Sequence, residues 1–442
     1  MDDTHNPRRQ SWVVSANRPD TAFPIQNLPF GVVAGADGPS IGVAIGDRIL
    51  HLRTCANLLG PAPTTIVEAC TAGTLDPLMV LGPPSWSALR GRLSDLLRTD
   101  HPQAAAHQRA LEPHLVAMTD VTMLKPVRIG GYTDFYASID HAKTVGSFFR
   151  PDMPLLPNYR YVPIGYNGRV SSIVLSGEPV RRPPGQTAAG PGTAPVFGPS
   201  RRLDYEIEVG FFVGTGNPLG EAVAIDYAAE HLFGVCLLND WSARDIQAWE
   251  YQPLGPFLAK SFASTISPWI VTMEALAPFR VPASARPPQD PSPLPYLHSE
   301  QDQQEGAIDL TLEVHLRSAR MQEAAMKAIR LSRTNLRTLY WTPAQLLTHH
   351  TSNGCNLEPG DLLGSGTVSG PARDNCGCLL ELTQNGREPV TLPTGETRTF
   401  LEDGDEITLL GYCERPGFAR IGLGHCSGTI QSWYPGRDDN SV

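Results

Sequence analysis

Residues 203–214, LDYEIEVGFFVG, are the stretch around which the rest of the chain is interpreted. Apolar and charged side chains alternate here, which predicts a β-strand with the carboxylates of Asp204, Glu206 and Glu208 on one face. Carboxylates about 7 Å apart repel by about 2 kcal/mol at an effective dielectric of about 20. If this face is exposed, it is an ordinary solvated strand surface. If it is buried, a cation or a proton has to compensate the charge, and other groups should converge on it.

Composition limits the possible classes of protein. The 442 residues are enough for a large core and for two domains, and the 41 glycines and 41 prolines favour short strands and ordered loops over long helices. A formal charge of −10 gives no electrostatic support for binding nucleic acid or an anionic membrane. No apolar run approaches the roughly 18 residues of a membrane-spanning helix. The polar start, MDDTHNPRRQ, lacks the apolar core of a secretory signal, so we expect a cytoplasmic protein.

The first part of the chain shows structure but no chemistry. SWVVSA, FGVV and SIGVAIGDRILHL predict short strands, the last with a turn at Gly46 and Asp47, and WSALRGRLSDLLR predicts an amphipathic helix. The eight cysteines include no C-x-x-C pair and no zinc-like pairing with histidines, so we expect reduced thiols.

Beyond residue 125, local patterns predict elements that carry polar groups. Asn167 and Gly168 between apolar runs predict a hairpin turn. Asp240 follows a buried strand and is expected to cap the next helix, with Arg244 and Gln247 on one face of it. Glu381 lies within an apolar segment that predicts a strand, and a buried carboxylate requires a partner.

Two further segments can be interpreted either as ordinary structure or as part of a functional site. IGGYTDFYASIDHAKTVGSFFR concentrates Asp134, Tyr136, His141 and Arg150, which suits a polar loop as well as a site. Lys260 lies between apolar residues in LAKSFASTISPW, where the commoner explanation is a buried stem with the ammonium group in water.

Together these segments resemble the fumarylacetoacetase branch of the fumarylacetoacetate hydrolase family. The resemblance covers nearly the whole chain in the family's order and is carried by FPIQNLPFGV, YTDFY, PIGYNGR, SGEPVRRPPGQ, LDYEIEVGFFVG, NDWSARDIQAWEYQPLGPFLAKSF, SGTVSGP and FLEDGDEITLLGYC. It implies a mainly β fold with some α: a small N-terminal SH3-like barrel, residues 1–124, then a large mixed β-roll catalytic domain, residues 125–442. It also implies a homodimer.

The resemblance further implies a site for Mg²⁺ or Ca²⁺, hard cations that oxygen ligands suit. It places the ligand carboxylates at Asp134, Glu206, Glu208 and Asp240, with Lys260 and Ser264 beside them. His141 corresponds to the general base and Glu381 to its orienting partner, while Arg244, Gln247 and Lys260 surround a developing alkoxide. The positions that match substrate contacts are Tyr136, Arg150, Tyr166, Arg244, Gln247, Tyr251 and Thr367.

The reaction implied is metal-dependent hydrolysis of a carbon–carbon bond in 4-fumarylacetoacetate, a small β-diketo acid, to fumarate and acetoacetate. This is the last step of tyrosine and phenylalanine degradation. Two alternatives stay open: a related reaction of the superfamily, acylpyruvate hydrolysis or oxaloacetate decarboxylation, and a catalytically silent, metal-stabilised binding protein.

The chain departs from the family pattern near two of these positions. Gly131 stands where an aspartate is common before YTDFY, and Cys376 and Cys378 replace a phenylalanine and a serine ahead of Glu381. No departure removes a residue with an implied role. The two thiols predict that the surroundings of Glu381 are sensitive to oxidation.

Overall fold

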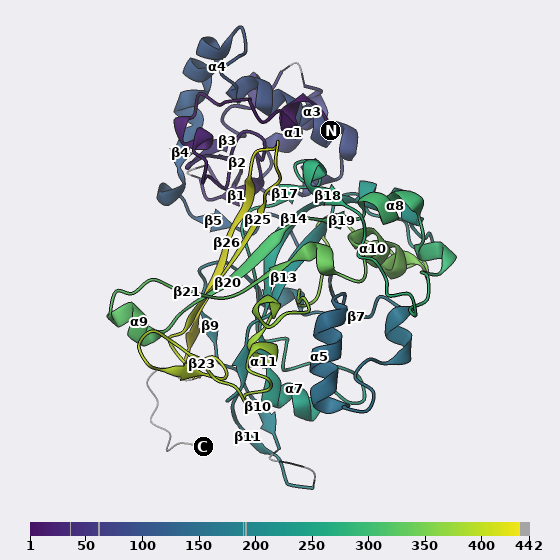
Figure 1. Cartoon of the computed structure of the whole chain (residues 1–442). Helices are drawn as coiled ribbons and strands as arrows, with labels where there is room; N and C mark the ends of the chain where they lie inside the picture. Colours follow the sequence, from purple (N-terminus) through teal and green to yellow (C-terminus); the bar gives the residue numbers. More distant parts are fainter. Residues whose placement is uncertain (36, 61, 189, 191, 434–442) are drawn as a thin grey trace.

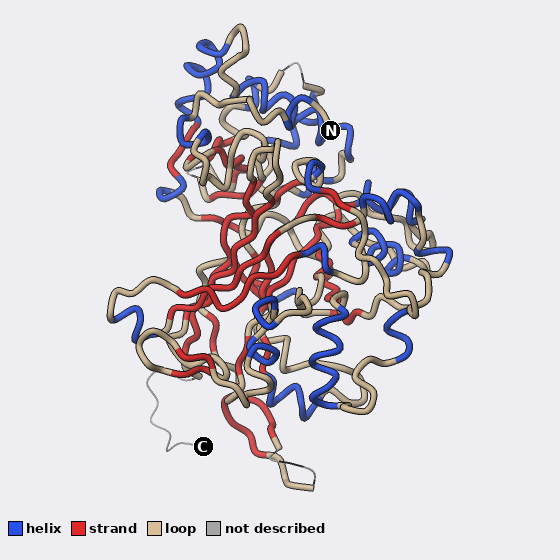
Figure 2. The backbone as a smooth tube through the Cα atoms, in the orientation of Figure 1, coloured by secondary structure: helices blue, strands red, loops and turns tan. Residues whose placement is uncertain are grey.

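The structure is a computed structural model of the chain that describes all residues except 36, 61, 189, 191 and 434–442. The fold mixes α and β and is mostly sheet, as predicted (Figure 2). The strands run through the middle of the molecule, and most helices lie around them (Figure 2). Among the described residues, no helix has the length and apolar character needed to cross a membrane.

The N-terminal part, purple to blue in Figure 1, forms a five-stranded antiparallel sheet in the order β4-β3-β2-β1-β5. Its strands are β1 Phe30–Val33, β2 Ser40–Ile45, β3 Arg48–His51, β4 Leu115–Ala117 and β5 Met123–Leu124. Between β3 and β4 the chain forms α1 Thr64–Cys70, α2 Asp76–Met79, α3 Pro83–Leu97 and α4 Ala104–Leu111. The predicted turn at Gly46 and the predicted amphipathic helix, α3, are confirmed.

The strand predicted for SWVVSA is wrong, because residues Val14–Asn17 form a 3-10 turn. Asn17 accepts a hydrogen bond from the Ser11 amide at 2.9 Å and donates one to the Ser11 carbonyl at 2.7 Å. These local side-chain bonds compete with strand pairing.

Two larger sheets build the rest of the molecule. The first is mixed, in the order β7-β6-β22-β13-β14-β16-β8 with β17 also on β14. Its strands are β6 Tyr132–Phe135, β7 Gly165–Asn167, β8 Ile173–Leu175, β13 Ile207–Val213, β14 Leu232–Asp240, β16 Ser264–Ile266, β17 Val271–Thr272 and β22 Leu362–Gly364. The second has the order β21-β20-β25-β26-β9, with β9 Val180–Arg181, β20 Thr311–Arg317, β21 Ile329–Asn335, β25 Glu406–Cys413 and β26 Ile421–Gln431.

Shorter elements surround these sheets (Figure 1). Four strand pairs are β10 Pro184–Thr187 with β11 Val196–Pro199, β12 Leu203–Asp204 with β15 Ser242–Ala243, β18 Arg280–Val281 with β19 Ala307–Ile308, and β23 Val390–Thr391 with β24 Thr397–Arg398. The helices are α5 Ile139–Phe149, α6 Ile225–Ala228, α7 Arg244–Glu250, α8 Glu300–Glu305, α9 Ala319–Glu323, α10 Pro343–Thr351 and α11 Leu379–Leu382.

The opening stretch is therefore two strands, β12 and β13, with a break at Tyr205 and Glu206. Every residue of both strands is buried, and so is Glu206 between them. The burial of Glu206 and Glu208 that a metal site requires is therefore confirmed, and the alternative of a solvated strand surface is excluded. Phe211 packs into the core shared with the second sheet, whereas Phe212 packs into a core formed with the N-terminal part. In the core formed with the N-terminal part, Trp86 of α3 packs edge-on against Phe233 of β14, with the ring centroids 5.0 Å apart.

Three local predictions fail because tertiary partners outcompete local signals. The hairpin at Asn167 is wrong: β7 pairs with β6 and β8 pairs with β16, and the Gly168 amide donates to the Tyr132 carbonyl at 2.8 Å. Asp240 caps no helix, because α7 begins at Arg244 with Ala243 as its N-cap. Glu381 lies in α11 and not in a strand; that short helix is buried at every position, which removes the periodicity that would reveal it.

Candidate active site

A cavity of about 390 Å³ gathers most of the residues that the sequence singles out. It is lined by β6, α5, β7, β13, α7 and the turn after β22, and α5, α7 and α11 lie close together in the lower part of Figure 1. The predicted residues that line it are Asp134, Tyr136, His141, Arg150, Tyr166, Glu206, Glu208, Arg244, Gln247, Tyr251, Lys260 and Thr367. Asp240 and Ser264 line a smaller neighbouring cavity of about 180 Å³, and Glu381 lies behind His141.

Three carboxylates from three strands of one sheet converge where this cavity and its smaller neighbour meet the sheet. Asp134, Glu208 and Asp240 are buried, and an oxygen of each lies within 4.8 Å of an oxygen of the others. Among the described residues, neither carboxylate oxygen of Glu208 has a hydrogen-bond partner. A Cβ atom added to Gly364 of β22 would lie 2.5 Å from Asp134 Oδ1 and 3.2 Å from Glu208 Oε2. The missing side chain leaves a cradle of oxygens, which fits a hard cation such as Mg²⁺ or Ca²⁺.

The electrostatics of this carboxylate trio point the same way. Burial raises the pKa of Asp134 to about 8, and the nearby charge of Asp240 adds to the effect. Burial raises the pKa of Glu208 well above its usual value, and the nearby charges of Asp134 and Asp240 add to the effect. Three ionised carboxylates at this spacing repel strongly, so the trio requires protons or a cation.

Glu206 points to the protein's own cations and stands outside the trio. One of its oxygens lies 2.7 Å from Arg244 Nη1, and the other forms an ion pair with Lys260 Nζ. Burial opposes ionisation, but Lys260 and Arg244 outweigh it and hold the pKa of Glu206 below its usual value.

Lys260 is buried and joins Glu206 to the trio, because its Nζ also donates to Asp240 Oδ2 at 2.8 Å. An ammonium group held in water is therefore the wrong interpretation of Lys260. Burial would lower its pKa, yet the two carboxylates raise it. Ser264 donates to the other oxygen of Asp240 at 2.9 Å, and Tyr166 also donates to Asp240, at 2.9 Å.

His141 and Glu381 meet although they are far apart in the chain. His141 Nδ1 lies 2.9 Å from Glu381 Oε2, and the same oxygen accepts hydrogen bonds from Ser369 Oγ at 2.7 Å and Cys378 Sγ at 3.2 Å. Burial opposes ionisation of Glu381, but His141 and these donors lower its pKa. Ser138 caps α5 through the His141 amide, which fixes the backbone of the histidine. The pairing directs Nδ1 to Glu381 and leaves Nε2 for the cavity.

Asp204 is a site residue that sequence reasoning missed. It is fully buried, and its oxygens accept hydrogen bonds from Arg244 Nε at 3.0 Å and from the amides of Leu379 and Leu380 at 2.8 and 2.9 Å. One carboxylate thus fixes both the guanidinium in the cavity wall and the start of the helix that carries Glu381. The only local signal was its place on the same strand face as Glu206.

The wall of the cavity combines cations with apolar surface. Arg244 Nη1 donates to Gln247 Oε1 at 3.2 Å, so these two residues of α7 act as one polar edge. Arg150 stands at the end of α5, and the apolar lining comes from Val145, Phe149 and Ile164. This arrangement suits a small anionic ligand with an apolar centre.

All eight cysteines are free thiols, as expected, and seven are buried. Burial raises the pKa of Cys376 to about 12 and that of Cys378 well above its usual value. Oxidation requires a thiolate, so the geometry does not favour the predicted sensitivity to oxidation.

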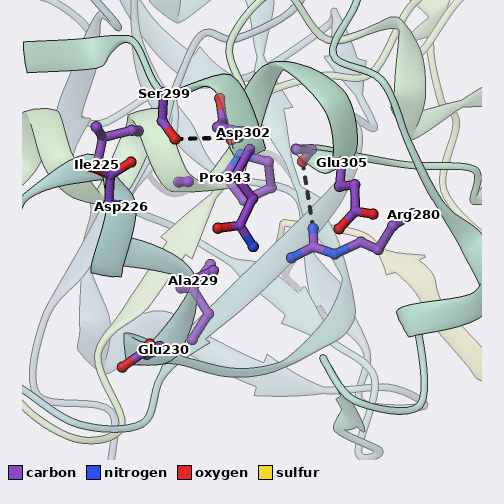
Figure 3. A pocket seen from close by; sticks show the side chains of 13 residues that line it. Ile225, Asp226, Ala229, Glu230, Arg280, Ser299, Asp302, Glu305 and Pro343 are labelled. Carbon is purple, nitrogen blue, oxygen red and sulfur yellow. Dashed lines mark hydrogen bonds between the residues drawn. The ribbon is translucent and has the colours of Figure 1, made fainter. Parts of the chain in front are cut away.

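A second cavity, shown in Figure 3, lies away from these residues and is lined by α6, α8 and the start of α10. Two of its hydrogen bonds appear in Figure 3: Ser299 caps α8 at the Asp302 amide, and Arg280 donates to the Gly306 carbonyl at 3.5 Å. Asp302 also accepts a hydrogen bond from Thr342 at 2.8 Å. It contains none of the predicted site residues.

Comparison with known proteins defines the class. The fumarylacetoacetate (FAA) hydrolase C-terminal model matches residues 131–431, and the fumarylacetoacetase N-terminal model matches residues 26–126. The chain belongs to the fumarylacetoacetate hydrolase family and is a hydrolase, which excludes the catalytically silent alternative.

Within this family the chain is similar to fumarylacetoacetases. It is 47% identical to that of Rattus norvegicus over 416 residues, which cover 93% of this chain and 96% of the relative. It is 47% identical to that of Homo sapiens over 93% of this chain and 96% of the relative, and 49% identical to that of Caenorhabditis elegans over 92% and 96%. Among solved structures, a fumarylacetoacetate hydrolase from psychrophilic Exiguobacterium antarcticum is 17% identical, covers 92% of this chain and 99% of its own, and has a TM-score of 0.49.

Proposed function

We propose that this hydrolase cleaves the carbon–carbon bond of 4-fumarylacetoacetate to give fumarate and acetoacetate, as the last step of tyrosine and phenylalanine degradation. The observation that carries the proposal is one cavity that joins an imidazole, two carboxylates of the buried trio and three cations, with Glu381 behind His141 and Asp240 in the neighbouring cavity. The printed names of relatives at 47% identity over nearly the whole chain support the choice of substrate.

His141 acts as the general base. Its Nε2 takes a proton from a water that attacks the carbonyl beside the fumaryl double bond, and the ionised Glu381 stabilises the imidazolium that forms. Arg244, Gln247 and Lys260 line the cavity where the attacked oxygen becomes negative, and their donors stabilise that charge.

Collapse of this alkoxide breaks the carbon–carbon bond, and acetoacetate leaves as an enolate that takes up a proton. Mg²⁺ or Ca²⁺ held by Asp134, Glu206, Glu208 and Asp240 would supply Lewis-acid stabilisation of the negative oxygen. Glu206 can keep its ion pairs and still offer a lone pair, because each carboxylate oxygen accepts more than one partner. Lys260 and Ser264 hold Asp240 in place through both of its oxygens.

The remaining lining residues bind the substrate. Arg150 takes a terminal carboxylate, since a guanidinium matches a carboxylate in charge and geometry. Hydroxyl groups that position the rest come from Tyr136, Tyr166, Tyr251 and Thr367. We further propose a cytoplasmic homodimer, with residues 1–124 as an SH3-like barrel domain and residues 125–442 as the catalytic β-roll domain.

The test is incubation of the purified enzyme with 4-fumarylacetoacetate, with and without EDTA, while fumarate is measured. Acylpyruvates and oxaloacetate serve as comparison substrates, because their reactions also generate an enolate. We expect metal-dependent loss of fumarylacetoacetate at a kcat/KM above that of the comparison substrates. Absence of metal-dependent turnover, or preference for oxaloacetate, would refute the assignment.

A further inference from the structure

We propose that His141, Cys378 and Glu381 form a binding site for a soft divalent cation such as Zn²⁺, separate from the carboxylate trio. A ring nitrogen of His141, Cys378 Sγ and a Glu381 oxygen all lie within 4.8 Å of one another. Two of these separations are shorter: 2.9 Å from Nδ1 to Oε2 and 3.2 Å from Sγ to Oε2. All three side chains are buried, and His141 connects them to the cavity.

The spacing fits a single ion. Zn²⁺ binds nitrogen and oxygen at about 2.0–2.2 Å and thiolate sulfur at about 2.3 Å, so the ligand atoms of a tetrahedral site lie about 3.3–3.6 Å apart. The three atoms can reach that spacing by small side-chain rotations, and a water from the cavity completes the coordination. Ser369 Oγ, 2.7 Å from the same Glu381 oxygen, helps to hold that carboxylate.

The ligand types separate this site from the trio. Asp134, Glu208 and Asp240 offer only oxygens, which suit Mg²⁺ or Ca²⁺, whereas a thiolate and an imidazole select softer ions. When Zn²⁺ binds, the thiol proton of Cys378 leaves to solvent, and the single proton of the neutral imidazole moves from Nδ1 to Nε2.

Occupancy of the site would stop the proposed reaction, because Nε2 of His141 then carries a proton and cannot act as the base. This consequence rests on the proposed function, but the cation site itself does not. Zn²⁺ would therefore inhibit the enzyme at a place that Mg²⁺ does not occupy.

The test is a titration of the full-length enzyme, in saturating Mg²⁺, with Cd²⁺, whose bond to a thiolate produces an ultraviolet charge-transfer band. Cys378→Ser keeps a donor to Glu381 but removes the soft ligand. Cys355→Ser is the matched control, since Cys355 is the one cysteine that is not buried. We expect the band in wild type and in Cys355→Ser but not in Cys378→Ser. The affinity of Cys378→Ser for Zn²⁺, measured by competition with a chromophoric chelator, should fall at least about tenfold.

An equal band in Cys378→Ser, or no band in wild type, would overturn the site. Inhibition of fumarylacetoacetate hydrolysis by Zn²⁺ is a separate measurement, taken relative to each variant's own activity without Zn²⁺. Inhibition that a chelator reverses and that is weaker in Cys378→Ser supports the proposal. If the band behaves as expected and Zn²⁺ does not inhibit, the base role of His141 fails while the cation site stands.

Discussion

Replacing Asp204 with asparagine is predicted to loosen both halves of the active site at once. The two oxygens of Asp204 accept hydrogen bonds from Arg244 Nε and from the amides of Leu379 and Leu380. Asparagine offers one oxygen and one NH₂ group, so the NH₂ group would face donors. With the NH₂ group in place of Oδ2, the hydrogen bonds from Arg244 Nε and from the Leu380 amide would be lost, together with the charge pair between Asp204 and Arg244.

The size of the effect follows from these contacts. A hydrogen bond to a charged group contributes about 1.5–3 kcal/mol, and breaking a buried ion pair costs about 3–5 kcal/mol. Arg244 keeps Glu206 at 2.7 Å, so we expect the lower end of the range, about 3 kcal/mol of the free energy of unfolding. We expect kcat to fall about 100-fold with a smaller change in KM, since displacement of catalytic groups by about 1 Å costs that much.

A matched variant separates positioning from stability. Asp405 is also fully buried and binds Arg398 Nε at 2.8 Å and Nη2 at 3.0 Å, but it does not line the cavity. Urea unfolding and steady-state kinetics of Asp204→Asn and Asp405→Asn should give similar losses of stability and a loss of kcat only in Asp204→Asn. Wild-type kcat in Asp204→Asn, or an equal loss in Asp405→Asn, would refute the reasoning.

Three other predictions test the trio and the base. The pKa of Asp134 in the folded protein, about 8, lies above its ordinary value of 3.8. Between these two pH values the folded state holds a proton on Asp134 that the unfolded state has released, so the metal-free protein should lose stability as the pH rises from 3.8 to about 8. Calorimetry should therefore show that Mg²⁺ raises the melting temperature more at the upper end of this pH range than at the lower end. The difference between the two ends should be smaller in Asp134→Asn. Equal increases in melting temperature at both ends in the wild type would contradict this prediction. Gly364→Ala puts a methyl group into the cradle of oxygens and should weaken Ca²⁺ binding at least about tenfold in calorimetric titration. The control Gly198→Ala adds its methyl group in open space and should leave the affinity for Ca²⁺ unchanged. Equal affinities of the two variants for Ca²⁺ would show that the ion does not bind beside Gly364. His141→Ala should lower kcat by about 10²–10⁴-fold and Glu381→Gln by less, because glutamine keeps a hydrogen bond but not the charge; the reverse order in steady-state kinetics would count against His141 as the base.

Local pattern was most informative where it needed no partner. The turn at Gly46 and the apolar stripe of α3 were predicted correctly, because backbone geometry and helical period are properties of short segments. The hairpin at Asn167 failed for the opposite reason. Gly168 serves close packing against Tyr132, a contact between strands that no local signal reveals.

The alternation of residues 203–214 was enough to predict Glu206 and Glu208 on one face and to make their burial the question that mattered, although the structure places Glu206 in the break just before β13. The family resemblance added the pairing of His141 with Glu381, which lie 2.9 Å apart.

The different roles of the carboxylates became visible only from their contacts in the folded protein. Glu206 is neutralised by Lys260 and Arg244, and Asp204 holds an amide 175 positions away. In the trio, Lys260 pairs with Asp240, whereas Glu208 has no hydrogen-bond partner among the described residues. Period-two spacing treats Asp204, Glu206 and Glu208 as equivalent, because it records only which face a side chain leaves from. Their roles differ because the partners come from distant segments, and burial makes each electrostatic contact strong.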